Sequence, residues 1–298
     1  MRFMPLHHIK RYQIPLAQYG RLLAGGRHGS RRVDALARIG TLQVRQTRRM
    51  LDIRAAQRLR YQVFYEEMGA RADARTKRKR RDADRFDSVC EHLVVSNRTA
   101  ARQGTRPLNR IIGTCRLQAR DAREIDHFYS AGEFDLAPIA ARNPQARLLE
   151  IGRSCVLPGF RNTRTMELIW HGIWAYAQEE CCDVMIGCAS MSGINPDKLE
   201  LPLSFLHHFA SAPAQWSARA HAGRHVPMDR MAREDIDVRE AIAALPPLLR
   251  AYLRLGATFG DGAVIDEQFN TTDVLVILPV AAIGQRYRKH FSRAVQAA

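Results

Sequence analysis

The sequence predicts an α/β fold (α+β in character) with one mixed β-sheet flanked by helices. Apolar runs with strand-like alternation recur between segments whose apolar residues have helical spacing. An apolar strand, an amphipathic helix and a second apolar strand follow one another between residues 148 and 189, which is typical of parallel strands joined by a crossover. No repeat or long linker interrupts the chain after residue 40. We therefore expect a basic arm at residues 1–40, one domain at residues 41–280 and a tail at residues 281–298.

The first half of this domain contains a strand, a helix and a hairpin. Residues 41–47 alternate as a strand does, and residues 51–68 place apolar side chains on one helical face. The basic residues 71–85 are expected to form an exposed loop or a polar helix. Residues 91–96 and 110–118 are β-rich and flank a turn that contains Gly, Pro and Asn, which indicates a hairpin.

The second half is organised around the strand that begins at Leu148. A connection with one helical turn, at residues 130–145, is expected to lead into it. A helix at residues 165–180 and a buried strand at residues 183–189 follow it. The remaining predicted elements are helices at 196–209 and 245–255, a loop at 211–230, and strands at 262–265 and 274–279.

The charge of the chain is strongly positive and unevenly distributed. Lys and Arg number 46 against 30 Asp and Glu, a formal net charge of +16, and Asp34 is the one acidic residue among the first 50. An acidic carrier protein, an anionic membrane surface and nucleic acid are the three anionic partners that such a chain suits. Nucleic acid is disfavoured, because no helix-turn-helix, zinc-finger or RNP spacing accompanies the basic residues 71–85.

The cysteine pattern and the apolar runs favour a cytoplasmic protein. Six cysteines occur without a CxxC pair, which indicates reduced thiols. No apolar run approaches the roughly 20 residues that cross a bilayer, and the N-terminus lacks a signal-peptide core. Peripheral contact with the inner face of a membrane is left open.

The segment LLEIGRSCVLPGFRNTR, residues 148–164, carries the main functional signal. A buried strand leads through a turn into a helix, and this arrangement can pair with the amides of a pantetheine arm while the helix start binds its phosphate. Glu150 lies within the apolar strand, where burial would raise its pKa and suit it to accept a proton. The residues expected along the pantetheine and its phosphate are Gly152, Ser154, Arg161, Asn162, Thr163 and Arg164. Simple alternation places Glu150 and Arg153 on opposite faces, unless a bulge intervenes.

Five motifs carry a family resemblance. They are RLRYQVFYEEMGA at 58–70, DRFD at 84–87, GTCRL at 113–117, LEIGRSCV at 149–156 and the block at 245–278. The order of elements resembles the GNAT acyltransferase fold, and the motifs resemble the bacterial L-ornithine Nα-acyltransferases, also called ornithine–acyl carrier protein N-acyltransferases. This resemblance implies transfer of a 3-hydroxyacyl chain from acyl carrier protein to the α-amino group of L-ornithine, which gives lyso-ornithine lipid. It implies no tightly bound cofactor, because the 4'-phosphopantetheine belongs to the carrier.

The same resemblance suggests roles for individual residues. The expected substrate-binding set is Arg60, Phe64, Asp84, Asp87, Arg116 and Arg153. In it, Arg60 and Arg116 are candidates for the substrate carboxylate, and the two aspartates are candidates for the distal ammonium of ornithine. Structural ion pairing among these four residues is the alternative. Glu150 is expected to be the general base or a ligand of the amine, and its alternative is a structural pair with Arg153 or Arg116.

Other functions remain in competition. Part of the signature is similar to acyl-homoserine lactone synthases, and a non-catalytic protein that binds acyl carrier or lipid is a second alternative. The turn has Arg164 and Met166 where acetyl-CoA enzymes of this fold carry glycines, which favours a carrier-bound pantetheine over CoA. A covalent role for Cys155 and a metal site at His221 and His225 are disfavoured, since neither has the partners it would need.

Overall fold

The computed structural model describes residues 35–99 and 111–296, and the predicted basic arm lies for the most part outside these residues. The strands are β1 Ala37–Ile39, β2 Leu42–Thr47, β3 Glu91–Asn97, β4 Ile111–Asp121, β5 Phe134–Asp135, β6 Arg147–Val156, β7 Val184–Ser192, β8 Arg219–Ala220, β9 His225–Val226, β10 Thr258–Asp266 and β11 Thr271–Pro279. The α-helices are α1 Met50–Tyr61, α2 Ala74–Lys79, α4 Ala137–Arg142, α5 Thr163–Glu179, α6 Glu200–Ala210, α7 Val238–Ala244, α8 Pro247–Leu255 and α9 Gln285–Gln296. A π-helical turn, η1 Gln62–Glu67, continues α1, and short 3-10 turns include η4 Ala122–His127 and η5 Ser130–Gly132.

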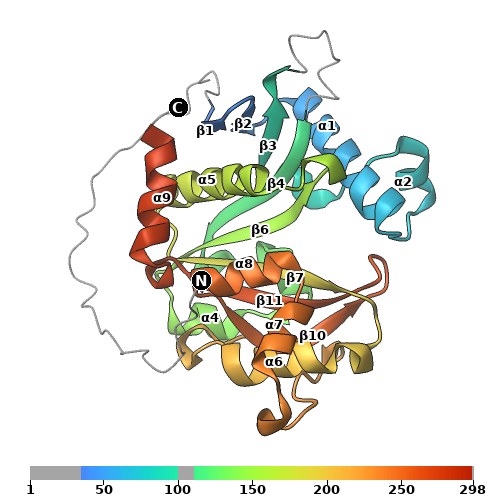
Figure 1. Ribbon diagram of the computed structural model, residues 1–298, viewed down its shortest axis with the longest axis vertical. Coiled ribbons are helices and arrows are strands. Elements are labelled where there is room, and N and C mark those ends of the chain that lie inside the picture. The colour runs from blue at the N-terminus through green and yellow to red at the C-terminus, as the bar shows by residue number, and fades with distance from the viewer. Residues whose placement is uncertain (1–34, 100–110, 297–298) are drawn as a thin grey trace. The chain divides into compact units, whose positions relative to one another are not determined.

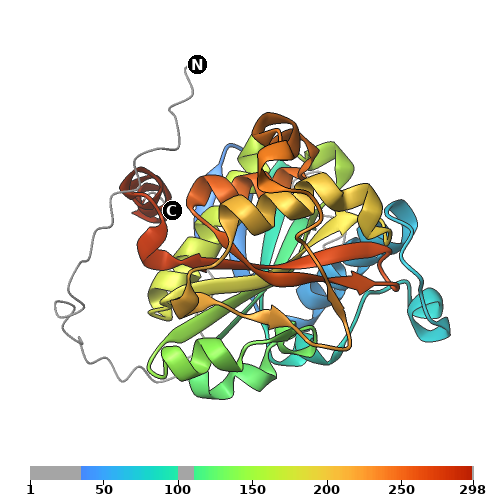
Figure 2. The same ribbon diagram turned by 90° about the horizontal axis from the view of Figure 1, so that it is seen from below.

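The strands form one mixed sheet in the order β1-β2-β3-β4-β6-β7-β11-β10-β8-β5. The predicted hairpin is present, since β3 and β4 are antiparallel. The predicted crossover is present as well, because β6 and β7 are parallel and joined through α5. Most other neighbouring strands are antiparallel, so the parallel pair β6 and β7 lies near the centre of a mainly antiparallel sheet. Helices cover both faces of this sheet (Figure 1, Figure 2).

Strand alternation divides the core between the two faces of the sheet. Leu93 and Val95 contribute to the cluster that includes α5, α6, α7 and α8, whereas Val94 packs with α1. A third cluster lies under α4 and contains Val184 and Ile186 of β7. The face that carries α1, α4 and the 3-10 turns is the face on which the functional residues gather.

Both ends of the fold extend beyond the expected limits of the domain. Ala37 of β1 is completely buried, although residues 1–40 were expected to form an arm. Phe291 of α9 is buried and stacks against Trp170 of α5, although residues 281–298 were expected to form a tail. The C-terminal sequence is polar overall, which hides a helix in which aromatic side chains on one face make the contact with the core.

Candidate active site

The strands β6 and β7 separate immediately after Glu150. They pair only through Leu148–Glu150 and Val184–Ile186 among the described residues, and beyond this point β6 follows β4 while β7 follows β11. Gly187 marks the branch, because a Cβ atom there would lie 2.4 Å from the carbonyl oxygen of Ile151. Figure 1 shows the two strands leaving in different directions, with α5 starting from the far end of β6.

A β-bulge in β6 redirects Arg153. Gly152 lies opposite Arg116 and Cys155 lies opposite Thr114, so two residues of β6 face one residue of β4. The φ of Arg153 is +48°, in the left-handed region. The exception stated for this strand therefore applies: the bulge breaks the simple alternation, and Arg153 and Glu150 both reach Tyr129.

The predicted charged residues form a buried ion-pair network, which we call the arginine–aspartate network: Arg60, Arg116, Arg153, Asp82, Asp84 and Asp87. Arg60 is completely buried, and its Nε lies 2.7 Å from Asp82 Oδ2 while its Nη2 lies 2.8 Å from Asp87 Oδ1. Arg116 donates to Asp84 and, at 3.3 Å, to Asp87. The four residues expected to bind the two charged ends of ornithine are thus paired with one another.

Asp87 and Arg116 stay charged despite their burial. Burial opposes ionisation of Asp87, but Arg60 and Arg116 hold the pKa of this carboxyl below its usual value. Burial likewise opposes the charge on Arg116, while Asp84 raises the pKa of the guanidinium above its usual value. Sequence reasoning did not select Asp82, although its place two residues before Asp84 was a usable signal.

Arg153 lies at the edge of this network, against two aromatic rings. Its guanidinium is 5.1 Å from the centre of the Tyr129 ring and 4.7 Å from that of Phe269. On the other side, its Nε lies 3.4 Å from Asp82 Oδ2. Phe64, predicted to bind substrate, packs edge-on against Phe269 at 5.8 Å. Arg153 therefore connects the arginine–aspartate network with the aromatic side chains of Tyr129 and Phe269.

Glu150 is buried and holds the loop that precedes β5. Its Oε2 accepts from Tyr129 N at 2.9 Å, and its Oε1 accepts from Ser130 N at 2.7 Å and Ser130 Oγ at 2.6 Å. Burial raises the pKa of Glu150, and the hydrogen bonds from Ser130 oppose that rise. Its hydrogen-bond partners are loop donors and not Arg153 or Arg116, and its role as base or amine ligand stays a prediction.

The predicted phosphate turn lies at the start of α5. Asn162 caps the helix by accepting from Thr165 N at 3.1 Å, which places Thr163 and Arg164 in the first turn. Arg161 donates to both carboxylate oxygens of Glu67 at 2.5 and 2.6 Å. On the strand before the turn, no heavy atom of the described residues, apart from the chain neighbours, lies within 4 Å of a Cβ added at Gly152, so that side of the strand has room. Ser154 is the second residue of the bulge.

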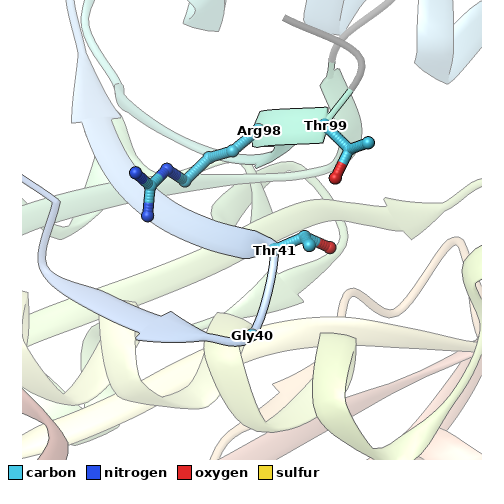
Figure 3. A pocket seen from close by; sticks show the side chains of 4 residues that line it. All are labelled: Gly40, Thr41, Arg98 and Thr99. Carbon is cyan, nitrogen blue, oxygen red and sulfur yellow. The ribbon is translucent and has the colours of Figure 1, made fainter. Parts of the chain in front are cut away.

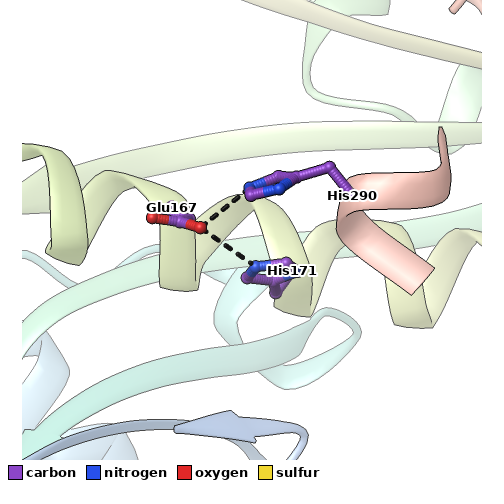
Figure 4. A group of neighbouring side chains, drawn as sticks. All are labelled: Glu167, His171 and His290. Carbon is purple, nitrogen blue, oxygen red and sulfur yellow. Dashed lines mark ion pairs between the residues drawn. The ribbon is translucent and has the colours of Figure 1, made fainter. Parts of the chain in front are cut away.

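Other clusters lie outside this centre. Glu167, His171 and His290 connect α5 with α9, and Glu167 Oε1 is 2.8 Å from His290 Nε2 (Figure 4). A surface hollow lies at the sheet edge between the β1–β2 turn and the end of β3 (Figure 3). Among the described residues, no helix is long and apolar enough to cross a membrane. Sequence reasoning missed a group of three neighbouring carboxylates, Glu133, Asp266 and Asp273. Glu133 Oε1 lies 3.5 Å from Tyr129 Oη.

The residues considered for other chemistry occupy different settings. Cys155 is buried, and burial raises the pKa of its thiol above the usual value, which works against a thiolate nucleophile. His221 Nε2 lies 2.8 Å from the carbonyl of Ala131, and His225 Nε2 lies 3.9 Å from Asp261.

Comparison with known proteins identifies the family. Residues 59–171 match the acetyltransferase (GNAT) domain model. The L-ornithine N(alpha)-acyltransferase of Agrobacterium fabrum is 48% identical over 255 residues, covering 85% of this chain and 86% of the relative. The proteins of the same name from Brucella abortus and Rhodobacter capsulatus are 47% and 38% identical, covering 86% and 85% of this chain and 90% and 96% of the relatives. Among solved structures, the N-acyl amino acid synthase FeeM from uncultured soil microbes aligns with a TM-score of 0.42 and 14% identity over 80% of this chain and 91% of its own. The chain has the GNAT acyltransferase fold and belongs to the L-ornithine Nα-acyltransferase family.

Proposed function

We propose that this protein transfers a 3-hydroxyacyl chain from acyl carrier protein to the α-amino group of L-ornithine and so forms lyso-ornithine lipid. The names of its relatives support ornithine as the acceptor. The observation that carries the proposal is the separation of β6 from β7 directly beside the buried carboxylate of Glu150. A thioester that lies along β6 beyond Glu150 would meet an amine held at that carboxylate.

The donor side of this proposal uses the edge of β6 and the start of α5. Beyond Glu150, β6 pairs with β4 on one side and has left β7 on the other, so its edge suits the amides of a pantetheine arm. The first turn of α5, with Thr163 and Arg164, would take the phosphate through its N–H groups and the added positive charge. Release of Arg161 from Glu67 requires little free energy, since exposed pairs contribute only about 0–1 kcal/mol.

A basic surface next to this turn suits an acidic carrier. Lys77, Arg78 and Lys79 lie in α2, a helix without buried residues that projects from the domain in Figure 1. Two ion pairs connect this surface with the phosphate turn through η1, because Arg80 pairs with Glu66 and Arg161 pairs with Glu67. A carrier steered to α2 would thus deliver its arm close to the start of α5.

The acceptor side requires an amine that has lost its proton. In our proposal, Glu150 takes this proton, directly or through water, because burial has made its carboxylate more basic. The amine nitrogen then attacks the thioester carbonyl, the C–S bond breaks, an amide forms, and the carrier thiolate leaves and regains a proton. Arg153 is the cation best placed for the α-carboxylate of the acceptor, since it lies at the edge of the network and its buried Nε, although 3.4 Å from Asp82 Oδ2, makes no hydrogen bond among the described residues.

The test is a reconstituted reaction with 3-hydroxyacyl carrier protein and L-ornithine. We expect multiple turnovers, with carrier thiol release that depends on ornithine and acyl-ornithine detected by mass spectrometry. Glu150→Gln should abolish product formation, whereas the matched control Glu179→Gln, at an exposed position of α5, should retain full rate. No thiol release above the rate without the protein would indicate a binding protein, and lactone formation from S-adenosylmethionine would indicate the synthase alternative. Equal rates with acyl-CoA would contradict the carrier as the specific donor.

We also propose a cytoplasmic location with peripheral membrane contact through the basic N-terminal residues. Each basic residue near an anionic surface contributes on the order of 1 kcal/mol. Deletion of residues 1–34 should therefore weaken co-sedimentation with vesicles that contain anionic lipid, and more strongly at low salt. Unchanged sedimentation would contradict this part of the proposal.

A further inference from the structure

Three carboxylates from distant parts of the chain converge beside the site, and we call them the acidic cluster. Glu133 follows η5, Asp266 ends β10 and Asp273 lies in β11. One oxygen from each lies within 4.8 Å of the others. Like charges at this spacing repel one another, and proteins rarely bury them without a compensating cation.

The acidic cluster contains buried acceptors without hydrogen-bond partners. Glu133, Asp273 and Thr271 are 4%, 5% and 4% exposed, respectively. Among the described residues, Glu133 Oε2, Asp273 Oδ1 and Thr271 Oγ1 have no hydrogen-bond partner. Thr271 lies on the same face of β11 as Asp273, two residues away, so its hydroxyl shares the space of the carboxylates. Buried polar atoms left in this state are uncommon and indicate a missing partner.

The cations close to these groups do not balance them. Arg224 approaches Glu133 only to 3.8 Å, and its side chain is 40% exposed. Burial, reinforced by Asp273, raises the pKa of Glu133 to about 7. Burial also raises the pKa of Asp273, against the effect of neighbouring hydroxyls. The cluster therefore has an excess of negative charge that a ligand cation could neutralise.

The acidic cluster is continuous with the proposed acceptor site. Tyr129 Oη lies 3.5 Å from Glu133 Oε1, and the same tyrosine donates its backbone N–H to Glu150. A second route runs from Glu150 to Ser130 Oγ at 2.6 Å and on to Cys188 Sγ at 3.5 Å. Burial raises the pKa of the Cys188 thiol, and Glu133 and Asp273 lie close enough to raise it further.

We propose that the acidic cluster binds the side-chain ammonium of the acceptor amino acid and thereby selects a basic acceptor. This inference rests on the proposed function and assigns it a specificity site. An ammonium group has three N–H donors, which matches the three partnerless acceptors on Glu133, Asp273 and Thr271, while Asp266 adds charge. Arg153, which lies over the Tyr129 ring while Glu133 lies near the hydroxyl of that ring, would hold the acceptor carboxylate, so the α-amine would lie between them near Glu150.

The experiment compares L-ornithine with L-norvaline, which has the same carbon chain without the side-chain amine. The wild type should prefer ornithine strongly in kcat/KM. Glu133→Gln and Asp273→Asn should each reduce that preference about 10- to 100-fold, since each removes a hydrogen bond to a charged group worth about 1.5–3 kcal/mol. The loss should appear in KM for ornithine and should exceed any change in KM for norvaline. Asp261→Asn is the matched control, because Asp261 lies on β10 but pairs with the exposed Arg219.

The outcomes separate this inference from the function on which it rests. An unchanged ornithine preference in both variants, or a wild type that uses the two amino acids equally, would overturn the ammonium site while leaving acyl transfer intact. Loss of activity with a chelator and recovery with Mg²⁺ or Ca²⁺ would overturn it in favour of a metal site. No transfer to ornithine by the wild type would overturn the proposed function itself. Independently of turnover, ornithine should raise the melting temperature of the wild type more than that of Glu133→Gln.

Discussion

Glu133 should make the stability of this protein fall as the pH rises through neutrality. Burial raises the pKa of its carboxyl from an ordinary 4.5 to about 7 in the folded state. Between these values the unfolded chain releases the proton while the folded chain retains it, so the free energy of unfolding declines with pH. At about 1.4 kcal/mol per pKa unit, the full effect is about 3 kcal/mol, complete only above pH 7.

The groups that face this carboxyl are few and come from several elements. They are Asp273 on β11, Asp266 on β10, Cys188 on β7, Tyr129 before η5 and Arg224 after β8. Glu133→Gln retains the shape of the protonated side chain and removes its titration. We expect urea unfolding to show equal stability of variant and wild type near pH 4.5, and a gain of up to about 3 kcal/mol for the variant at pH 8.

The control is Glu179→Gln, at an exposed position on α5, which should change stability by less than about 0.5 kcal/mol at either pH. A variant whose stability tracks that of the wild type from pH 4.5 to 8 would refute the reasoning, because Glu133 would then have the same proton affinity in both states. Addition of ornithine at pH 8 should reduce the difference, since a bound ammonium stabilises the ionised carboxylate.

Three other predictions concern the scaffold. Arg60→Ala should destabilise the protein by about 3–5 kcal/mol in urea unfolding, because it leaves Asp82 and Asp87 buried without their main cation. The control Arg48→Ala, which removes an exposed partner of Glu91, should lower the free energy of unfolding by less than about 1 kcal/mol. Similar losses for both variants would contradict the buried network. Gly187→Ala should cost about 1–3 kcal/mol through contact with the Ile151 carbonyl, and wild-type stability would show that β6 and β7 do not approach so closely. Phe291→Ala should lower the melting temperature through a loss of about 3–5 kcal/mol, and an unchanged temperature would mean that α9 does not pack on α5.

The central unit of the fold was predictable because its signals are local. Strand β6, the capped start of α5, and strand β7 occupy one continuous stretch in which periodicity and turn residues agree. Most residues of the arginine–aspartate network could also be selected from the sequence as candidates, since their motifs carry a family resemblance. Their pairing was not, because a sequence does not show whether a buried arginine meets a neighbouring aspartate or a substrate.

Two features were hidden for identifiable physical reasons. The bulge at Arg153 has no glycine to signal a positive φ, and the register of β4 against β6 imposes it. The acidic cluster joins Glu133 to Asp266 and Asp273, which are more than 130 residues further along the chain. Such a cluster forms only after β11 has paired with β7 and β10 has paired with β11. The helix α7 and the short strands β5, β8 and β9 were missed because they contain only two to seven residues.

The contrast between the two charged groups explains how one site could be both rigid and selective. In the arginine–aspartate network, three arginines face three aspartates, so the charges balance and the pKa of Asp87 is held below its usual value. In the acidic cluster the pKa values of Glu133 and Asp273 are raised instead, because burial is not offset by nearby cations. The unbalanced cluster gains free energy from a cation, whereas the balanced network has room for an anion only at its edge, where the Nε of Arg153 makes no hydrogen bond among the described residues. Tyr129 contacts both groups, since Arg153 lies over its ring and Glu133 lies near its hydroxyl, so a zwitterionic acceptor with a second amine would find its carboxylate partner and its ammonium partner beside the same tyrosine.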